Sequence, residues 1–355
     1  MRVVLALLLS SAAILLAACG TMTADREPST LPAGEAAPAQ VPNTTSDVRE
    51  TRSAATAGEI LVRGGSHRSV SARVHRDPGA SGCNKAMPQG LKAGGTTVRQ
   101  LTSGGLKRSY RLHIPPSATM TTRLPLVLNF HGRTGTAADQ EAYSGLLPVS
   151  DRETFLLVSP EGTGTPTGWS AGATPANSVD DIKFINDLLD TLQKELCVDG
   201  GRVYAAGFSN GAFMASRAAC ELPARITAIA AVGGLDFPQK GCGVPVPVIA
   251  FHGTADEVVL INGGLVRAWQ YAGAYDAFKR WAQNNDCIEP SDGVGIGGDA
   301  VRLAGGDCLA PTELVVVNGA GHVWPGSPAL PKQIATPVGA PELIWAFLSR
   351  QRIES

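Results

Sequence analysis

The stretch Arg202-Val-Tyr-Ala-Ala-Gly-Phe-Ser-Asn-Gly211 decides the fold of this chain. Its first half, Arg202–Ala206, is an apolar run typical of a buried strand, and its second half has the pattern Gly-x-Ser-x-Gly. A helix-like run, Ala212–Ala219, follows. A strand, this pentapeptide and a helix in succession predict a sharp turn that exposes the Ser209 hydroxyl above the end of a sheet, where it can act as a nucleophile. The alternative is a glycine-rich turn with an ordinary surface serine.

Two further residues complete a candidate triad, and each follows a predicted strand. Asp256 lies in a loop just after the apolar run Val246–Phe251. His322 lies in a glycine-rich loop just after the run Leu314–Val317. The order Ser, Asp, His is the one that this type of serine turn requires. Ser209 would attack a carbonyl, His322 would carry the proton, and Asp256 would orient the imidazole and stabilise its cation. The competing acids are Glu257, next in the chain, and Asp236.

A loop after an earlier strand supplies a candidate oxyanion hole. The run Pro125–Phe130 is followed by His-Gly-Arg-Thr-Gly135, whose glycines allow the backbone amides to turn inward. We expect one donor to be the backbone N–H of Asn210, the residue after the nucleophile, and the other to be the N–H of Arg133. His131 and His252 are interpreted as structural histidines with no part in proton transfer.

Four blocks of the sequence resemble one known family. The blocks are Phe130–Gly135, Arg202–Gly211, Phe251–Asp256 and Gly321–Gly326. They look like those of the α/β-hydrolase family of extracellular feruloyl esterases and poly(3-hydroxybutyrate) depolymerases, most of all its branch of actinobacterial surface lipoproteins. The resemblance covers about residues 83–350. It departs from the family pattern at Arg133-Thr134, where smaller or apolar residues are expected, and a separate polymer-binding module is not evident.

This resemblance implies a fold and a chemistry. The fold is an α/β-hydrolase with a mainly parallel central sheet, flanking helices and no large lid. The activity is that of a metal-independent serine esterase, with no cofactor, that acts on carboxylic esters of feruloyl, short-acyl or hydroxyalkanoate type. The family's triad falls on Ser209, Asp256 and His322. A serine peptidase or amidase on the same fold, or a catalytically silent binding lipoprotein, are the alternatives.

The N-terminus predicts export and a lipid anchor. Residues 1–18 have a short positive start and an apolar run that ends in Leu-Ala-Ala before Cys19, which resembles a bacterial lipoprotein signal peptide. Cys19 would be lipidated and hold the protein on the outer face of the cell membrane or envelope; ordinary secretion and a retained membrane anchor are the alternatives. Residues 19–80, rich in Ala, Pro, Ser and Thr, predict a disordered tether, and residues 81–355 predict the catalytic domain.

The remaining six cysteines predict three disulfides, since an even number is typical of exported proteins. Predicted topology favours pairing Cys220 with Cys242 and Cys287 with Cys308, which leaves Cys83 with Cys197. Exchanged partners involving Cys197 stay open. No Cys/His spacing indicates zinc.

The remaining patterns favour an α/β fold and exclude some functions. Apolar runs that alternate with helical patterns predict a mainly parallel sheet, opened by a hairpin around Ser103-Gly104-Gly105. A net charge of −1 gives no indication of a nucleic-acid partner. Gly293–Gly298 fits Gly-x-Gly-x-x-Gly, but it neither follows a predicted strand nor opens a helix, so we predict a surface loop. Trp169 and Trp324 are predicted to line an open substrate pocket that prefers flat or short acyl groups.

Overall fold

The computed structural model describes residues 82–171, 179–266, 269–288, 292–332, 334 and 336–353. All of these lie in one compact unit, Arg68–Ser355. The predicted signal peptide, Cys19 and the whole of the predicted tether lie outside the described residues. Within the described ranges, no helix is both long and apolar enough to cross a membrane.

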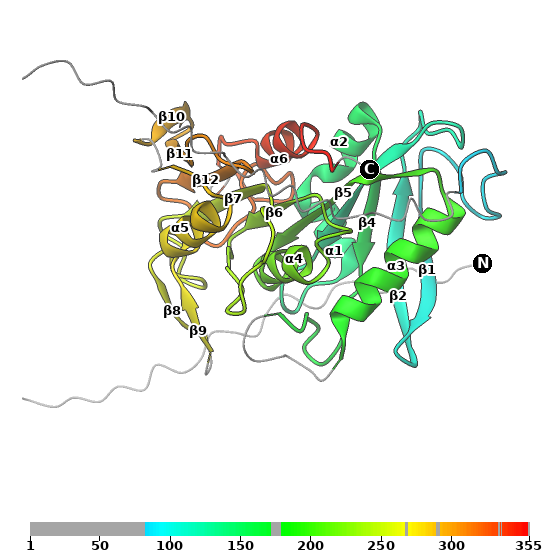
Figure 1. Cartoon of the computed structure of the whole chain (residues 1–355), viewed down its shortest axis with the longest axis horizontal. Coiled ribbons are helices and arrows are strands. Elements are labelled where there is room, and N and C mark those ends of the chain that lie inside the picture. Colours follow the sequence, from blue (N-terminus) through cyan, green and yellow to red (C-terminus); the bar gives the residue numbers. More distant parts are fainter. Residues whose placement is uncertain are drawn as a thin grey trace, which may run out of the picture. The chain divides into compact units, whose positions relative to one another are not determined.

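A ten-stranded sheet forms the centre of this unit (Figure 1). Its strand order is β1-β2-β4-β3-β5-β6-β7-β12-β11-β10. The six strands from β4 to β12 run parallel, and the outer strands at both edges pair antiparallel. A separate two-stranded sheet joins β8 and β9. The strands are β1 (Gly95–Ser103), β2 (Leu106–Ile114), β3 (Leu124–Phe130), β4 (Leu156–Pro160), β5 (Val198–Phe208), β6 (Ala228–Val232), β7 (Val248–Gly253), β8 (Gly263–Val266), β9 (Trp269–Ala272), β10 (Val294–Gly297), β11 (Ala300–Ala304) and β12 (Thr312–Val317).

Helices cover both faces of the sheet, which buries the apolar side chains of the central strands on both sides. One core contains side chains of α3, α4 and α5, and the other contains those of α2 and α6. Residues 233–247, between β6 and β7, insert no helix or strand above the sheet. The helices are α1 (Ala137–Ser144), α2 (Leu146–Glu153), α3 (Asp181–Glu195), α4 (Asn210–Glu221), α5 (Ala274–Asn284) and α6 (Ala340–Leu348).

The expected architecture is confirmed, with one correction at an edge of the sheet. The opening hairpin forms as β1 and β2, and every expected parallel strand is present. The segment Gly293–Gly298 is not a loop, because β10 lies within it and pairs antiparallel with β11. A Cβ atom on Gly293 would lie 2.3 Å from the Val301 Cγ1 atom, so this glycine admits a neighbouring strand. Gly293 therefore serves the packing of this edge of the sheet.

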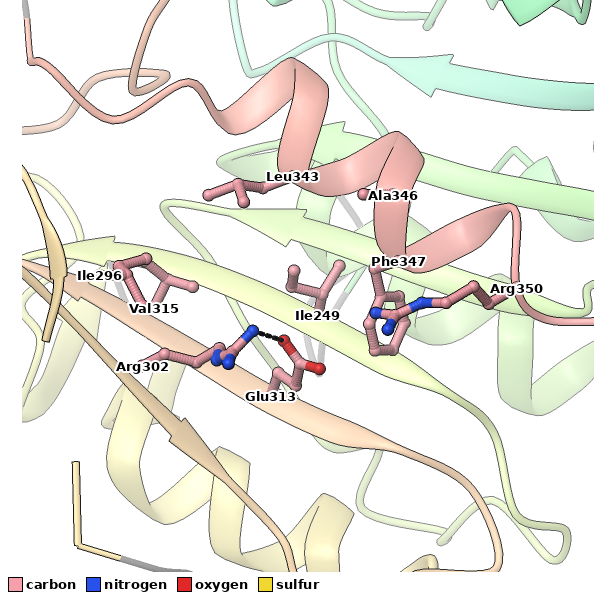
Figure 2. Close-up of a pocket in the computed structure, with 9 residues that line it drawn as sticks. All are labelled: Ile249, Ile296, Arg302, Glu313, Val315, Leu343, Ala346, Phe347 and Arg350. Carbon is pink, nitrogen blue, oxygen red and sulfur yellow. Dashed lines mark ion pairs between the residues drawn. The ribbon is translucent and has the colours of Figure 1, made fainter. Parts of the chain in front are cut away.

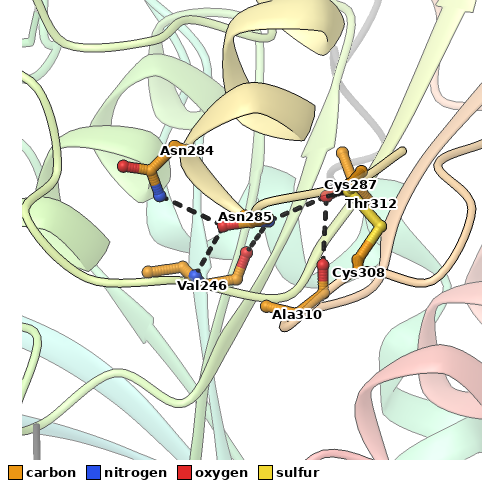
Figure 3. The surroundings of a disulfide bond; sticks show 7 residues. All are labelled: Val246, Asn284, Asn285, Cys287, Cys308, Ala310 and Thr312. Carbon is orange, nitrogen blue, oxygen red and sulfur yellow. Dashed lines mark hydrogen bonds between the residues drawn. A yellow bond between two sulfur atoms is a disulfide. The ribbon is translucent and has the colours of Figure 1, made fainter. Parts of the chain in front are cut away.

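Three disulfides join the pairs that the sequence favours: Cys83–Cys197, Cys220–Cys242 and Cys287–Cys308. The third lies beside a buried polar cluster at the start of β7 and β12 (Figure 3). There the Asn285 side chain accepts the Val246 N–H at 2.9 Å and donates to the Val246 carbonyl at 2.6 Å. Since disulfides persist in oxidising compartments and are rare in the cytosol, the three bonds indicate an exported protein.

The Cys83–Cys197 disulfide is expected to stabilise the fold most. It closes a separation of 114 residues, against 22 for Cys220–Cys242 and 21 for Cys287–Cys308. In the chain-entropy model, the longer loop is worth about 5 kcal/mol and each shorter one about 3 kcal/mol. Urea unfolding of the paired serine variants should therefore show the largest loss in free energy of unfolding for C83S/C197S. A larger loss in C287S/C308S, the matched control, would contradict this ranking.

Candidate active site

The nucleophile candidate lies where β5 ends and α4 begins. Ser209 has φ 54° and ψ −119°, a strained backbone conformation for a residue other than glycine. Its N–H donates to the Val232 carbonyl at 2.9 Å. A Cβ atom on Gly207 would lie 2.2 Å from the Gly211 carbonyl oxygen, and one on Gly211 would lie 2.3 Å from the Phe130 carbonyl oxygen. Both glycines are therefore required for the helix to start this close to the strands.

The acid candidate contacts the histidine candidate directly. Asp256 Oδ2 lies 2.7 Å from His322 Nδ1, while Asp256 Oδ1 accepts the N–H groups of Val258 and Val259 at 2.9 and 2.8 Å. Burial raises the pKa of Asp256, but the hydrogen bond and charge of His322 and the two N–H donors outweigh it, so the pKa is lowered overall. Asp256 is thus held as a carboxylate. Of the competing acids, Glu257 is exposed to solvent.

The serine and histidine candidates line the same cavity, whose volume is about 490 Å³. Phe208, the residue before the serine, also lines this cavity, and its ring centroid is 4.7 Å from that of His322. A Cβ atom on Gly233 would lie 3.2 Å from His322 Cε1, so this glycine leaves the space that the imidazole occupies. A volume of this size accommodates a small organic ligand. Its described lining is His131, Gly132, Arg133, Thr134, Gly135, Asp139, Gln140, Tyr143, Phe208, Ser209, Val258 and His322.

The backbone N–H groups of Arg133 and Asn210 are candidates for the oxyanion hole. Within the described ranges, neither N–H donates a hydrogen bond, and Asn210 is in the first turn of α4, where N–H groups have no partner in the helix. The adjacent amides are occupied: the Thr134 N–H donates to the Thr167 carbonyl at 2.9 Å, and the Gly135 N–H donates to the Gly132 carbonyl at 3.1 Å. This contrast favours Arg133 as the donor within the loop.

The two other histidines near the site are buried, and burial lowers the pKa of each. His131 Nε2 accepts the Gly162 N–H at 2.9 Å, which places its own proton on Nδ1, 2.7 Å from the Gly132 carbonyl oxygen. His252 Nε2 lies 2.7 Å from the Val259 carbonyl oxygen and donates to it. Both side chains hold loops in place as neutral imidazoles.

The two tryptophans predicted to line the pocket lie in the core instead. Trp169 and Trp324 are each 0% exposed, and neither is part of the described cavity wall. The Trp169 indole N–H donates to the His131 carbonyl at 2.9 Å. The Trp324 backbone N–H donates to Tyr143 Oη at 3.0 Å, which holds the loop next to His322. Their positions in the sequence correctly indicated large apolar side chains close to the site. Packing buries both side chains, so neither lines the cavity.

The aromatic wall of the cavity is formed by residues that the sequence analysis did not select. Tyr143 and Phe208 line it, and their rings meet edge to face with centroids 5.3 Å apart. Val258 adds an exposed apolar side chain beside them. Phe208 could have been found, since it directly precedes the nucleophile candidate. Tyr143 comes from α1, and no local signal links that helix to the site.

A second cavity, of about 370 Å³, lies between α6 and the β7–β12 region of the sheet (Figure 2). Leu343 and Phe347 of α6 face Ile249 and Val315 of the strands across it. Arg302 Nη1 and Glu313 Oε2 form an ion pair at 3.8 Å on its floor. None of the triad candidates lines this cavity, so it is separate from the candidate active site.

Comparison with known sequences identifies esterases among the relatives of this chain. Residues 108–277 match the family described as "Esterase PHB depolymerase". The chain is 30% identical to "Putative esterase NocK" of Nocardia uniformis subsp. tsuyamanensis over 263 residues, which covers 65% of this chain and 74% of that protein. It is also 30% identical to "Feruloyl esterase B" of Piromyces equi over 230 residues, 61% of this chain, but spans only 42% of that longer protein.

Comparison with solved structures gives the same fold. "Acetyl xylan esterase from Aspergillus awamori" superposes with a TM-score of 0.53 at 14% identity, over 71% of this chain and 99% of that chain. A structure titled "Crystal Structure of a Thermostable Esterase" superposes with a TM-score of 0.51 at 16% identity, over 72% of this chain and 63% of that chain.

Proposed function

Since the chain belongs to the α/β-hydrolase family of feruloyl esterases and PHB depolymerases, and is a carboxylic ester hydrolase, we propose that it cleaves esters through an acyl-enzyme on Ser209. The main support for this proposal is the arrangement of Ser209, His322 and Asp256. Ser209 and His322 line a single cavity, and the Asp256 carboxylate lies 2.7 Å from His322 Nδ1. Nucleophile, base and orienting acid are the parts that acyl transfer requires.

In the first half of the proposed reaction, the Ser209 oxygen attacks the ester carbonyl carbon while His322 Nε2 takes the hydroxyl proton. The N–H groups of Arg133 and Asn210 stabilise the negative charge that develops on the carbonyl oxygen. The bond to the alcohol then breaks, and His322 gives its proton to the leaving oxygen. Asp256, held ionised by its hydrogen bonds, keeps the His322 proton on Nδ1 and stabilises the transient imidazolium.

In the second half, water attacks the acyl carbon with His322 again as the base. The bond to Ser209 breaks, its oxygen recovers the proton, and the acid product leaves. A catalytically silent binding lipoprotein would not form an acyl-enzyme, so acylation of Ser209 would exclude that alternative. A peptidase or amidase would use the same residues, so an amide substrate measured beside its matching ester separates those two classes.

The cavity wall supports a choice of substrate class. Tyr143 and Phe208 favour a flat or short acyl group, since an aromatic pair adds about 0.5–1.5 kcal/mol beyond the area that it buries. No insertion between β6 and β7 provides a wall for a long chain. We therefore propose feruloyl, other short-acyl or hydroxyalkanoate esters as substrates.

A panel of substrates tests this choice. Methyl ferulate, short nitrophenyl esters and hydroxybutyrate oligomers are expected to give a higher kcat/KM than a long-chain triglyceride. Phe208→Ala should shift the preference among acyl groups, while Trp324→Phe, the matched control in the core, should leave it unchanged. A triglyceride as the best substrate would refute the assignment.

We also propose that Cys19 anchors the protein to the outer face of the cell membrane or envelope, at the start of a tether over residues 19–80. The support is the sequence Leu16-Ala-Ala-Cys19 after an apolar run, together with disulfides that are typical of exported proteins. Mass spectrometry of the mature N-terminus should find a lipid-modified Cys19, and Cys19→Ala should abolish that processing. An unmodified terminus at another residue would rule out the anchor.

A further inference from the structure

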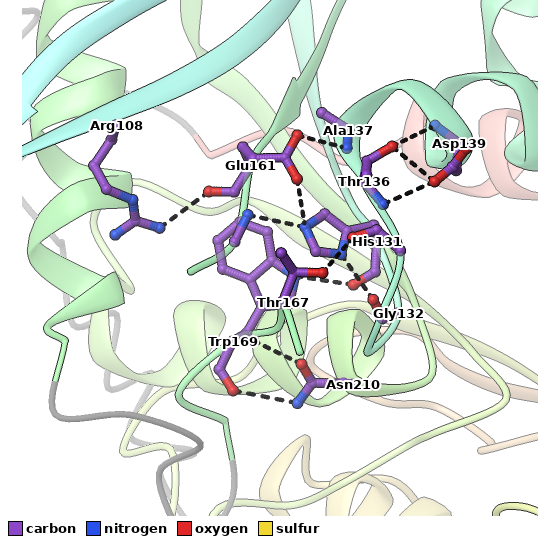
Figure 4. A network of polar contacts seen from close by, with 12 residues as sticks. Arg108, His131, Gly132, Thr136, Ala137, Asp139, Glu161, Thr167, Trp169 and Asn210 are labelled. Atoms are coloured by element: carbon purple, nitrogen blue, oxygen red, sulfur yellow. Dashed lines mark hydrogen bonds and ion pairs between the residues drawn. The ribbon is translucent and has the colours of Figure 1, made fainter. Parts of the chain in front are cut away.

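The segment Glu161–Trp169, which follows β4, connects the loop that carries the Arg133 N–H to the first turn of α4, which carries the Asn210 N–H; we call this segment the brace. Its base is held by His131, which accepts the Gly162 N–H at 2.9 Å, and by Glu161, which accepts the Ala137 N–H at 3.0 Å (Figure 4). Thr163 and Gly168 exchange N–H to carbonyl bonds of 3.0 Å each, which close the brace on itself. These two bonds hold residues 163–168 in a closed turn.

The Asn210 side chain makes two hydrogen bonds to a single backbone residue of the brace, Trp169. Asn210 Oδ1 accepts the Trp169 N–H at 2.7 Å, and Asn210 Nδ2 donates to the Trp169 carbonyl at 3.3 Å (Figure 4). Ser209 provides no side-chain hydrogen bond to cap α4. The amide of Asn210 thus ties the first turn of α4 to the brace.

The indole of Trp169 fixes that backbone position in turn. It is fully buried, its N–H donates to the His131 carbonyl at 2.9 Å, and its ring meets Phe130 edge to face at 5.1 Å. Phe130 and His131 are the end of β3 and the start of the loop that carries Arg133. Through Trp169, the start of α4 is therefore held in place relative to the end of β3.

Thr167 holds the other donor loop. Its carbonyl accepts the Thr134 N–H at 2.9 Å, and its hydroxyl donates to the Gly135 carbonyl at 2.8 Å. Thr134 has φ 68°, a conformation that a residue with a side chain adopts only under constraint, and this pair of bonds supplies the constraint. The Gly132 carbonyl, which shares a peptide plane with the Arg133 N–H, accepts the Gly135 N–H at 3.1 Å, and this bond fixes the direction of the Arg133 N–H.

We propose that the Asn210 side chain is a positioning residue, which acts through the brace to set the separation of the Arg133 and Asn210 N–H groups. This inference rests on the proposed function. Oxyanion donors are effective because they are oriented before charge develops, and here they come from separate elements. An error of about 1 Å in such geometry can cost about a hundredfold in rate.

Asn210→Ala isolates this role, because it removes both bonds to Trp169 and keeps the backbone N–H of residue 210. We expect kcat to fall about 10- to 100-fold while KM changes less than about threefold. An arylboronic acid, which forms a tetrahedral adduct with the serine, should lose affinity in parallel with kcat/KM. A merely structural role would not weaken the boronate selectively over the ground-state substrate.

Asn285→Ala is the matched control. Asn285 makes the same two-point bridge to one backbone residue, Val246, but lies beside the Cys287–Cys308 disulfide and does not line the catalytic cavity (Figure 3). It should lower the melting temperature and leave unchanged the kcat per active site, counted by titration with a phosphonate. Thr167→Val provides a second probe, since it removes only the hydroxyl bond to Gly135 and keeps the side-chain shape. It should lower kcat about 3- to 10-fold with KM unchanged.

The outcomes separate the two proposals. If Asn210→Ala and Thr167→Val keep wild-type kcat and boronate affinity, the positioning role is wrong and the serine mechanism stands. If the wild-type protein shows no turnover that depends on Ser209, the proposed function is wrong, and the positioning role is wrong with it. If Asn210→Ala does not fold, Thr167→Val decides alone.

Discussion

Ser209→Ala is expected to remove nearly all ester hydrolysis and to leave the fold intact. The substitution deletes the attacking oxygen, while the β-carbon and the backbone at φ 54° stay as they are. By analogy with other serine hydrolases, kcat should fall about 10⁶-fold. A residual acceleration of about 10³-fold over water can persist, because the oxyanion donors and substrate binding remain.

Initial rates on a short nitrophenyl ester, with circular dichroism for the fold, measure this result. Ser216→Ala is the matched control, since Ser216 is buried in the same helix and donates to the Ala212 carbonyl at 3.1 Å. It should keep wild-type kcat. His322→Ala should cost about as much as Ser209→Ala, and the double variant little more, because triad members act as a unit. Wild-type turnover in Ser209→Ala would remove the basis of the mechanism.

Asp256→Asn is expected to give the next largest loss, about 10⁴-fold in kcat, again without unfolding. The asparagine oxygen can still accept the N–H groups of Val258 and Val259, and this leaves its NH₂ group facing His322. An NH₂ group cannot accept the Nδ1 proton, so the imidazole is driven to carry its proton on Nε2. A protonated Nε2 cannot act as a base toward Ser209.

Glu257→Gln is the control for Asp256→Asn. Glu257 is the adjacent acid and is exposed, so its amide should support kcat within about threefold of wild type. Both variants are measured at neutral pH, where the lowered pKa of Asp256 keeps the wild-type carboxyl ionised. If Glu257→Gln lost as much activity as Asp256→Asn, or if Asp256→Asn kept most of its activity, the acid would be misassigned.

The local sequence alone determined most of the fold and the positions of the site candidates. Apolar runs followed by glycine-rich turns predicted the central strands, and all of them form. The ends of parallel strands meet at one edge of a sheet, so Ser209, Asp256 and His322 could be assigned to the same edge without knowing any contact. Gly207 and Gly211 were also informative in the sequence, because a turn this tight has no room for a Cβ atom at either position and therefore requires glycine.

Only the tertiary structure decided what covers each side chain. Asp256 and Glu257 are neighbours in the sequence, and the turn after β7 buries one against His322 and exposes the other. Trp169 and Trp324 follow strand ends as pocket residues would, but contacts from distant segments draw both indoles into the core. The bond between Asn210 and Trp169 joins residues 41 positions apart. Composition and periodicity report which side chains are buried, whereas the partner of each depends on long-range packing that no short stretch encodes.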